Sequence, residues 1–147
     1  MLYIASDHGG FKLKEHLKKY LAKNKIAVTD LGPKKYVPTD DYPDYAKILG
    51  QKVSKNPLRD SGVLICRNGQ GVCIVANKFA NVRAATAWNV MGAKMIREHD
   101  MSNVLCLPGD YVSPHMAENI LEKWLDTPYS TDPRHIRRIK KITSLEK

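Results

Sequence analysis

A loop that joins a cysteine to two glycines is the stretch of this sequence with the clearest chemical potential. It spans residues 66–71, reads Cys-Arg-Asn-Gly-Gln-Gly, and directly follows a continuous apolar run. Glycines at the start of a helix let successive backbone N–H groups point into one cavity, where the helix dipole also favours negative charge. A thiol at such a place, beside Arg67, is favoured as the thiolate, so Cys66 is a candidate base or nucleophile.

The alternatives for this loop are a buried structural cysteine and a simple anion-binding turn. We adopt the structural interpretation for Cys73 and Cys106, which lie inside apolar runs. The loop has neither the Lys-Ser/Thr ending of a P-loop nor the three glycines of the dinucleotide fingerprint. Its predicted chemistry therefore depends on Cys66 rather than on the glycines alone.

Two further pairs of polar residues lie where strands or helices are expected to end. Asp7 and His8 follow the first apolar run, where they can meet a polar ligand, but Asp7 can equally cap the next helix. His99 and Asp100 follow a helical pattern, where a histidine can also satisfy helix carbonyls. No spacing of His, Asp and Glu suggests a metal site, so we expect no metal.

The positive charge is concentrated in two segments. The 147 residues carry 24 Lys and Arg against 15 Asp and Glu, and the excess of nine lies in residues 11–25 and 134–141. Six lysines in the first segment alternate with apolar residues at helical spacing, which predicts a solvated helix face. In the second segment, Arg134 and Arg138 are four apart and would share one side of a helix. This pair suits phosphate or carboxylate, and the alternative is a basic helix end or a tail that touches nucleic acid.

Short apolar runs alternate with helical patterns along the whole chain. We expect strands over 2–5, 26–29, 62–66, 82–87 and 103–107, and helices over 11–22, 45–53, 72–79 and 91–98, with two more helices after Ser113 and around the arginine pair. This alternation predicts a single domain, residues 1–147, with a three-layer, doubly wound, Rossmann-like α/β fold around a five-stranded parallel sheet. Ligands of such sheets bind beyond the carboxyl ends of the strands, which here are residues 6–10, 67–71, 88–89 and 108–110.

Composition narrows the class of protein further. A hydrophobic fraction of 43% with 27% charged residues excludes a disordered chain, and no apolar run approaches the roughly 20 residues of a membrane helix. Asp7 interrupts the N-terminus before a signal-peptide core can form, and three cysteines without Cys-x-x-Cys spacing favour a reducing cytoplasm. Because there is no aromatic–basic interleaving or recognition motif, we expect neither nucleic acid nor a membrane as a partner.

Seven segments occur in an order that is familiar as a set. They are Ser6-Asp7-His8-Gly9-Gly10-Phe11, Asp41-Tyr42-Pro43, the Gly-rich loop followed by Ala76-Asn77-Lys78, Val82-Arg83-Ala84-Ala85, Arg97-Glu98-His99, Asn103-Val104-Leu105 and Arg134-His135-x-Arg137-Arg138. Together they resemble the ribose-5-phosphate isomerase B family, which includes the galactose-6-phosphate isomerase subunits, over residues 2–139. The resemblance implies a cofactor-free aldose–ketose isomerase of the pentose phosphate pathway that interconverts ribose 5-phosphate and ribulose 5-phosphate through an enediolate. It also implies a homodimer, often paired into tetramers, with active sites between two subunits and the C-terminal helix reaching toward the partner.

The resemblance also implies roles for individual residues. Cys66 stands where many members keep the base that moves a proton between C2 and C1, whereas other members use a glutamate at the position of Val72. Asp7 would hold sugar hydroxyls, and His99 of the partner subunit would assist ring opening. Backbone N–H groups of the loop would stabilise the enediolate oxygen. His8 and the two C-terminal arginines would bind the phosphate. The full set of implied substrate ligands is His8, Tyr42, Arg67, Asn68, Gly69, Gly71, Asp100, Arg134 and Arg138.

Three positions depart from the family pattern. Arg67-Asn68-Gly69 replaces the usual Gly-Thr/Ser-Gly, Asp100 replaces the Asn that commonly follows His99, and Pro108-Gly109-Asp110 replaces a Gly-Gly-Arg whose arginine binds phosphate. We hypothesise that Arg67 takes over part of the role of that arginine. The departures leave open an isomerase of another aldose phosphate, such as allose or galactose 6-phosphate, and a catalytically silent sugar-phosphate-binding protein; the retained Cys66 and His99 favour an isomerase.

Overall fold

A single five-stranded sheet organises the computed structural model, which describes residues 1–146; the predicted domain runs one residue further, to position 147, which lies outside the described residues. All neighbouring strands pair in parallel, in the order β2-β1-β3-β5-β4, so the predicted parallel Rossmann-like fold is confirmed. The elements are β1 (Leu2–Ser6), α1 (Phe11–Lys23), β2 (Thr29–Asp30), α2 (Tyr42–Lys55), β3 (Ser61–Cys66), α3 (Gln70–Ala76), β4 (Ala84–Thr86), α4 (Val90–Glu98), β5 (Val104–Pro108), α5 (Pro114–Asp126) and α6 (Pro133–Thr143).

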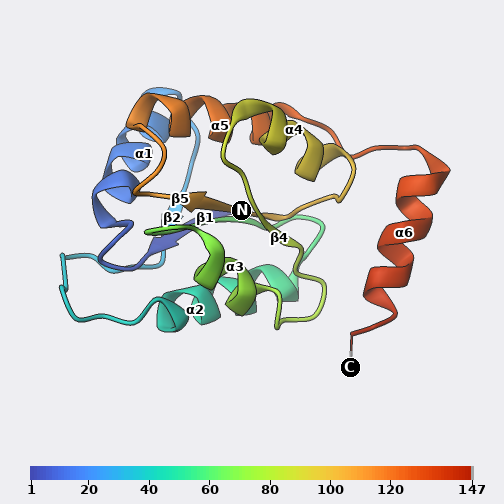
Figure 1. The fold of residues 1–147 in the computed structure, drawn as a ribbon, viewed down its shortest axis with the longest axis horizontal. Helices are drawn as coiled ribbons and strands as arrows, with labels where there is room; N and C mark the ends of the chain where they lie inside the picture. Colours follow the sequence, from blue (N-terminus) through green and yellow to red (C-terminus); the bar gives the residue numbers. More distant parts are fainter. Residues whose placement is uncertain (147) are drawn as a thin grey trace.

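Helices cover both faces of the sheet, α1, α4 and α5 on one face and α2 and α3 on the other (Figure 1). Crossovers between parallel strands are right-handed, so the direction of each crossover decides which face its helix covers. The crossovers through α1 and α4 run in one direction along the strand order, and those through α2 and α3 run in the other. The strand order therefore generates the three layers.

The central strand β3 contributes to both apolar cores. Val63 and Ile65 pack with the face covered by α1 and α5, whereas Leu64 and Cys66 pack with the face covered by α2 and α3. A strand covered on both faces has no reason to alternate polar and apolar residues, which explains the continuous apolar run in the sequence. This strand delivers Cys66 to the carboxyl edge of the sheet.

The edge strands are shorter than predicted, and α2 begins earlier. The second strand was predicted over 26–29 but contains only Thr29–Asp30. The chain must first turn after α1, where Lys25 adopts a positive φ of 59° and Ile26 N–H still bonds to the helix. The helix predicted over 45–53 begins at Tyr42, because Pro43 fits the first turn of a helix, where no N–H partner is needed.

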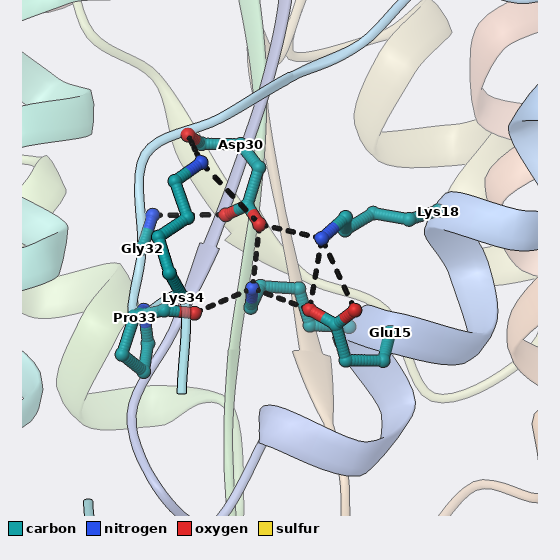
Figure 2. A network of polar contacts seen from close by, with 7 residues as sticks. Glu15, Lys18, Asp30, Gly32, Pro33 and Lys34 are labelled. Carbon is teal, nitrogen blue, oxygen red and sulfur yellow. Dashed lines mark hydrogen bonds and ion pairs between the residues drawn. The ribbon is translucent and has the colours of Figure 1, made fainter. Parts of the chain in front are cut away.

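The predicted solvated lysine face is wrong for one of its six lysines, Lys14. The side chain of Lys14 is 0% exposed, and its Nζ lies 2.9 Å from Asp30 and from Glu15. Lys18 adds an ion pair of 2.7 Å to the same Asp30 carboxylate (Figure 2). Burial alone would raise the pKa of Asp30, but hydrogen bonds from Lys18 and Lys14 lower it to about 2. Helical spacing predicts that Lys14 faces solvent. The lysine can be buried because β2 brings the Asp30 carboxylate next to its ammonium group.

The C-terminal helix α6 stands apart from the layers that cover the sheet (Figure 1). None of its residues is buried, and Ile136 and Ile142 on it are 37% and 46% exposed. The helix itself is confirmed; its reach toward a partner subunit stays a prediction.

Candidate functional site

The loops that follow β1 and β3 meet at the point where the strand order reverses direction. The strands are neighbours, and the N–H of Asp7 donates to the carbonyl of Ile65 over 3.3 Å. A Cβ on Gly9 would lie 2.5 Å from Cγ of Arg67, so the loops can approach this closely only because residue 9 is glycine. Ligands of open parallel sheets bind at such a switch point.

Cys66 ends β3 with its side chain turned into the start of the next helix. The residue is 5% exposed, and its Sγ accepts a hydrogen bond from the N–H of Gly69 over 3.2 Å. Gly69 has a φ of 75°, a left-handed conformation that glycine adopts without strain, and the side chain of Asn68 lies 3.9 Å from the sulfur. The sulfur therefore lies between a backbone donor, the N–H of Gly69, and an acceptor, Oδ1 of Asn68.

Asp7 and His8 lie beside this loop in the turn before α1. Asp7 is 5% exposed, and its Oδ1 accepts a hydrogen bond from the N–H of Gly10 over 3.0 Å. Burial raises the pKa of Asp7, although the Gly10 N–H and the charge of His8 oppose this. His8 contacts Asp40, a residue that was not predicted as part of the site.

Tyr42 contacts the cysteine loop from α2, the neighbouring helix on the same face of the sheet. It is the first residue of α2, and a Cβ on Gly71 would lie 2.7 Å from Cζ of the Tyr42 ring. The residue is 39% exposed, so part of its surface stays open although the ring packs on the loop. Tyr42 therefore lies beside the loop that carries Cys66, with part of its surface available to a ligand.

Arg67 and Asp110 face each other across the loops after β3 and β5. Their side chains form an ion pair of 3.3 Å, and the N–H of Asp110 donates to the carbonyl of Arg67 over 2.9 Å. The side chains are 62% and 44% exposed, so solvent screens the pair strongly. The acid that replaces the family arginine thus lies next to the new cation.

Four predicted residues lie elsewhere in the chain: His99, Asp100, Arg134 and Arg138. The end of α4 lies beside the amino ends of the strands, because Ser102 N–H bonds to Ile96 and Asn103 N–H bonds to Arg83 at the start of β4. The helix of a β–α–β unit runs antiparallel to its strands, so it starts at the carboxyl edge and ends at the opposite one. His99 is therefore placed away from Cys66 within one chain.

The helix that carries both arginines, α6, begins beside His99 rather than beside Cys66. The rings of His99 and His135 stack with centroids 4.5 Å apart, which joins the start of α6 to the end of α4. Arg134 pairs with Asp132 over 2.7 Å, and hydrogen bonds from Arg134 lower the pKa of that carboxyl. One chain thus assembles Asp7, His8, Tyr42 and residues 66–71 in one place, whereas a second group is formed by the end of α4, with His99 and Asp100, and the adjoining α6, with Arg134 and Arg138.

Sequence reasoning missed two residues that support the first cluster. Asp40 contacts His8 from 32 positions away, and Thr86 Oγ1 donates to the carbonyl of Gly69 over 3.1 Å. Asp40 lies in a polar loop, and Thr86 lies within the strand predicted over 82–87, but neither position carries a local signal for its partner. Within residues 1–146 no three His, Cys, Asp or Glu side chains are grouped so as to hold a metal ion, and none of the helices has the length and apolarity to cross a membrane.

Comparisons with known proteins agree on one family. The family model described as ribose/galactose isomerase matches residues 2–142. A probable ribose-5-phosphate isomerase B of Mycoplasma pneumoniae is 42% identical over 99% of this chain and 95% of its own length. The ribose-5-phosphate isomerase B of Escherichia coli is 36% identical over 95% of this chain and 92% of its own length.

Solved structures give the same result. Ribose-5-phosphate isomerase B of Mycoplasma genitalium with bound ribulose-5-phosphate superimposes with a TM-score of 0.95 at 41% identity, covering 99% of this chain and 95% of that chain. The enzyme of Thermotoga maritima superimposes with a TM-score of 0.91 at 40% identity, covering 97% of both chains.

Proposed function

Because this chain belongs to the ribose/galactose isomerase family, we propose that it interconverts ribose 5-phosphate and ribulose 5-phosphate. The observation that carries the proposal is Cys66 at the switch point of the sheet with the N–H of Gly69 on its sulfur. A thiol held there, in a chain 41% identical to an enzyme with bound ribulose-5-phosphate, fits proton transfer on a sugar phosphate. The reaction needs no net oxidation, so no cofactor is required.

The thiolate of Cys66 acts as the base in this proposal. It removes the proton from C2 of the open-chain aldose, which breaks the C2–H bond and leaves a cis-enediolate. The same proton returns to C1, and the proton of the C2 hydroxyl is transferred to O1, which yields the ketose. Backbone N–H groups in residues 67–71 stabilise the enediolate oxygen, and one such donor contributes about 3 kcal/mol when it is well aimed.

The remaining residues of the first cluster bind the sugar. Asp7 accepts hydrogen bonds from sugar hydroxyls, and His8 with Arg134 and Arg138 binds the phosphate. Arg67 supplies a further cation close to this site, and its exposed pair with Asp110 is weak enough to exchange for a phosphate. Tyr42 lies against Gly71 beside this site.

The second cluster serves the site of another subunit. His99, Asp100, Arg134 and Arg138 lie away from Cys66 in one chain, so a homodimer in which each subunit completes the other's site would use both clusters. Exposed Ile136 and Ile142 on α6 support such an assembly, because unpartnered apolar side chains favour a protein contact. His99 of the partner subunit then assists ring opening, and dimers can pair into tetramers.

The free Cys66, Cys73 and Cys106 support a cytoplasmic location.

The Arg67–Asp110 pair also favours a second candidate, an isomerase of allose or galactose 6-phosphate. Arg67 places the cation in the loop after β3 instead of the loop after β5, which shifts the position at which a phosphate is bound. A hexose 6-phosphate carries its phosphate one carbon further from C1 than ribose 5-phosphate does. A catalytically silent sugar-phosphate-binding protein is the third possibility.

An isomerisation assay across ribose 5-, allose 6- and galactose 6-phosphates separates these functions, with Cys66→Ala as the control. We expect fastest turnover on ribose 5-phosphate and none above background for the variant. Preference for a hexose phosphate would establish the second candidate. Absence of turnover on all three sugars, with binding retained, would establish the silent protein.

A further inference from the structure

Asp40 is a buried acid that the proposed mechanism leaves without a role. It lies in the segment between β2 and α2, and its side chain is only 7% exposed. Its Oδ1 accepts a hydrogen bond from the backbone N–H of His8 over 2.8 Å and lies 2.8 Å from Nδ1 of the same residue. One carboxylate oxygen therefore contacts His8 at both its backbone and its ring.

This double contact fixes the orientation and the tautomer of the imidazole. An ionised carboxylate only accepts hydrogen bonds, so the proton must reside on Nδ1 of His8. The other ring nitrogen, Nε2, is left for a ligand. The same arrangement orients histidines that bind metals or act in catalysis, where a carboxylate behind the ring sets which nitrogen faces forward.

The charges around His8 favour its cationic form. The hydrogen bond to Asp40 raises the pKa of His8, burial opposes this, and the charge of Asp7 on the same turn adds to the increase. From α2, Tyr45 faces Asp40: burial raises the pKa of Tyr45, and the carboxylate charge raises it further. From the loop after β3, the stem of Arg67 packs against Gly9 beside His8.

Asp40 in turn depends on His8. Its Oδ2 is buried and has no hydrogen-bond partner within residues 1–146. The hydrogen bonds to Oδ1 come from the backbone and the ring of His8, while the Tyr45 hydroxyl faces the carboxylate from α2. Asp40 and His8 are therefore coupled, because the ring nitrogen lies 2.8 Å from the carboxylate oxygen.

We propose that Asp40 is a positioning residue of the phosphate subsite, which orients His8 and keeps its ring cationic so that Nε2–H donates to the phosphate of the substrate. The inference rests on the proposed function, because that function places the phosphate at His8. It adds a residue outside the seven sequence motifs and explains how the ring of His8 is held in a fixed orientation.

The test compares Asp40→Asn with Asp44→Asn, which removes one exposed acid from the same region of the chain. NMR titration of the His8 ring should show a lower pKa in Asp40→Asn and an unchanged value in Asp44→Asn. The KM for ribose 5-phosphate should differ less between the two variants near pH 6 than near pH 8, because the charge of the ring depends less on Asp40 at the more acidic pH. Near pH 8 it should be about tenfold higher in Asp40→Asn, with kcat changed much less.

Two readouts keep the inference separate from the proposed function. Inorganic phosphate is titrated into each protein while the His8 ring is followed by NMR, which needs no turnover. Weaker phosphate binding in Asp40→Asn, with the His8 shift lost, supports the positioning role even if ribose 5-phosphate is not the substrate. An unchanged His8 titration overturns the role, as does a lowered one with unchanged phosphate affinity. If Asp40→Asn does not fold, titration of the wild-type ring is the test, because a His8 pKa at or below its ordinary value contradicts the proposal and a raised one supports it.

Discussion

The backbone N–H of Gly69 donates to Sγ of Cys66 over 3.2 Å, three residues along a loop that turns back on the strand it leaves. The positive φ of Gly69 permits this turn, and Cβ at that position would come within 3.1 Å of backbone atoms of Leu107 and Pro108. The sulfur thus meets a fixed donor before any substrate binds. The loop thereby holds the sulfur at the place from which the proposed proton transfer would start.

Cys66→Ser should lower kcat on ribose 5-phosphate by about 10²–10⁴-fold, because a hydroxyl is a far weaker base at neutral pH. Cys73→Ser is the matched control, since Cys73 follows in α3 and has no role in the proposed mechanism. Alkylation is a poor substitute, because a hydrogen bond with the Cys106 thiol lowers the pKa of Cys73 to about 7. Steady-state kinetics and thermal melting check both variants, and equal losses of activity would refute the assignment.

Arg67→Ala should raise the KM for ribose 5-phosphate by about tenfold, because a charge-assisted bond to phosphate is lost. Asp110→Asn should lower KM, because it frees Arg67 from the ion pair that holds it in the absence of substrate. Arg59→Ala, at an exposed position away from these loops, should change neither constant. An unchanged KM in Arg67→Ala would show that this side chain does not replace the missing arginine.

Lys14→Met should reduce the free energy of unfolding by about 3 kcal/mol, because it leaves the buried Asp30 carboxylate with fewer compensating charges. Lys12→Met, on an exposed face of the same helix, should stay within about 0.5 kcal/mol of the wild type. Urea unfolding followed by circular dichroism measures both. Equal stability of the two variants would mean that the network in Figure 2 contributes little.

Asp30 should make stability fall in strong acid. Its folded pKa of about 2 lies below the ordinary 3.8, so its contribution is fully present above about pH 4 and is lost as the pH falls toward 2. Asp30→Asn should therefore flatten the decrease in unfolding free energy between pH 5 and 2, by about 1–2 kcal/mol after screening by solvent. A slope identical to that of the wild type would contradict this.

Mixing two inactive variants tests the shared active site. If His99 acts in the site of the partner subunit, a hybrid of Cys66→Ala and His99→Asn chains contains one site with both native residues. Random reassembly should recover about one quarter of wild-type activity. The separate variants, refolded in the same way, are the controls. Activity that never exceeds theirs would place His99 outside the partner's site.

The sequence by itself determined most of the elements and which residues would gather in the first cluster of the candidate site. Apolar runs and helical spacing are local signals, so they predicted the parallel sheet and the loops at its carboxyl edge. The continuous run of β3 placed Cys66 at a strand end, and the glycines after it marked a close turn. Asp7 and His8 followed from the same rule about strand ends. The predicted lengths of the edge strands β2 and β4 were too large. An edge strand is hydrogen-bonded to a neighbour on one side only, so it is shorter than its apolar residues suggest.

Only the tertiary structure decided which charges are buried and which residues meet. Lys14 follows the pattern of a solvated lysine until β2 brings Asp30 to it, and Asp40 is one acid in a polar loop until that loop reaches His8. These contacts join residues 16 and 32 positions apart, so no local spacing records them. The tertiary structure also separates His99 from Cys66. Helix α4 starts at the carboxyl edge of the sheet, where Cys66 lies, and ends at the opposite edge, where His99 follows it.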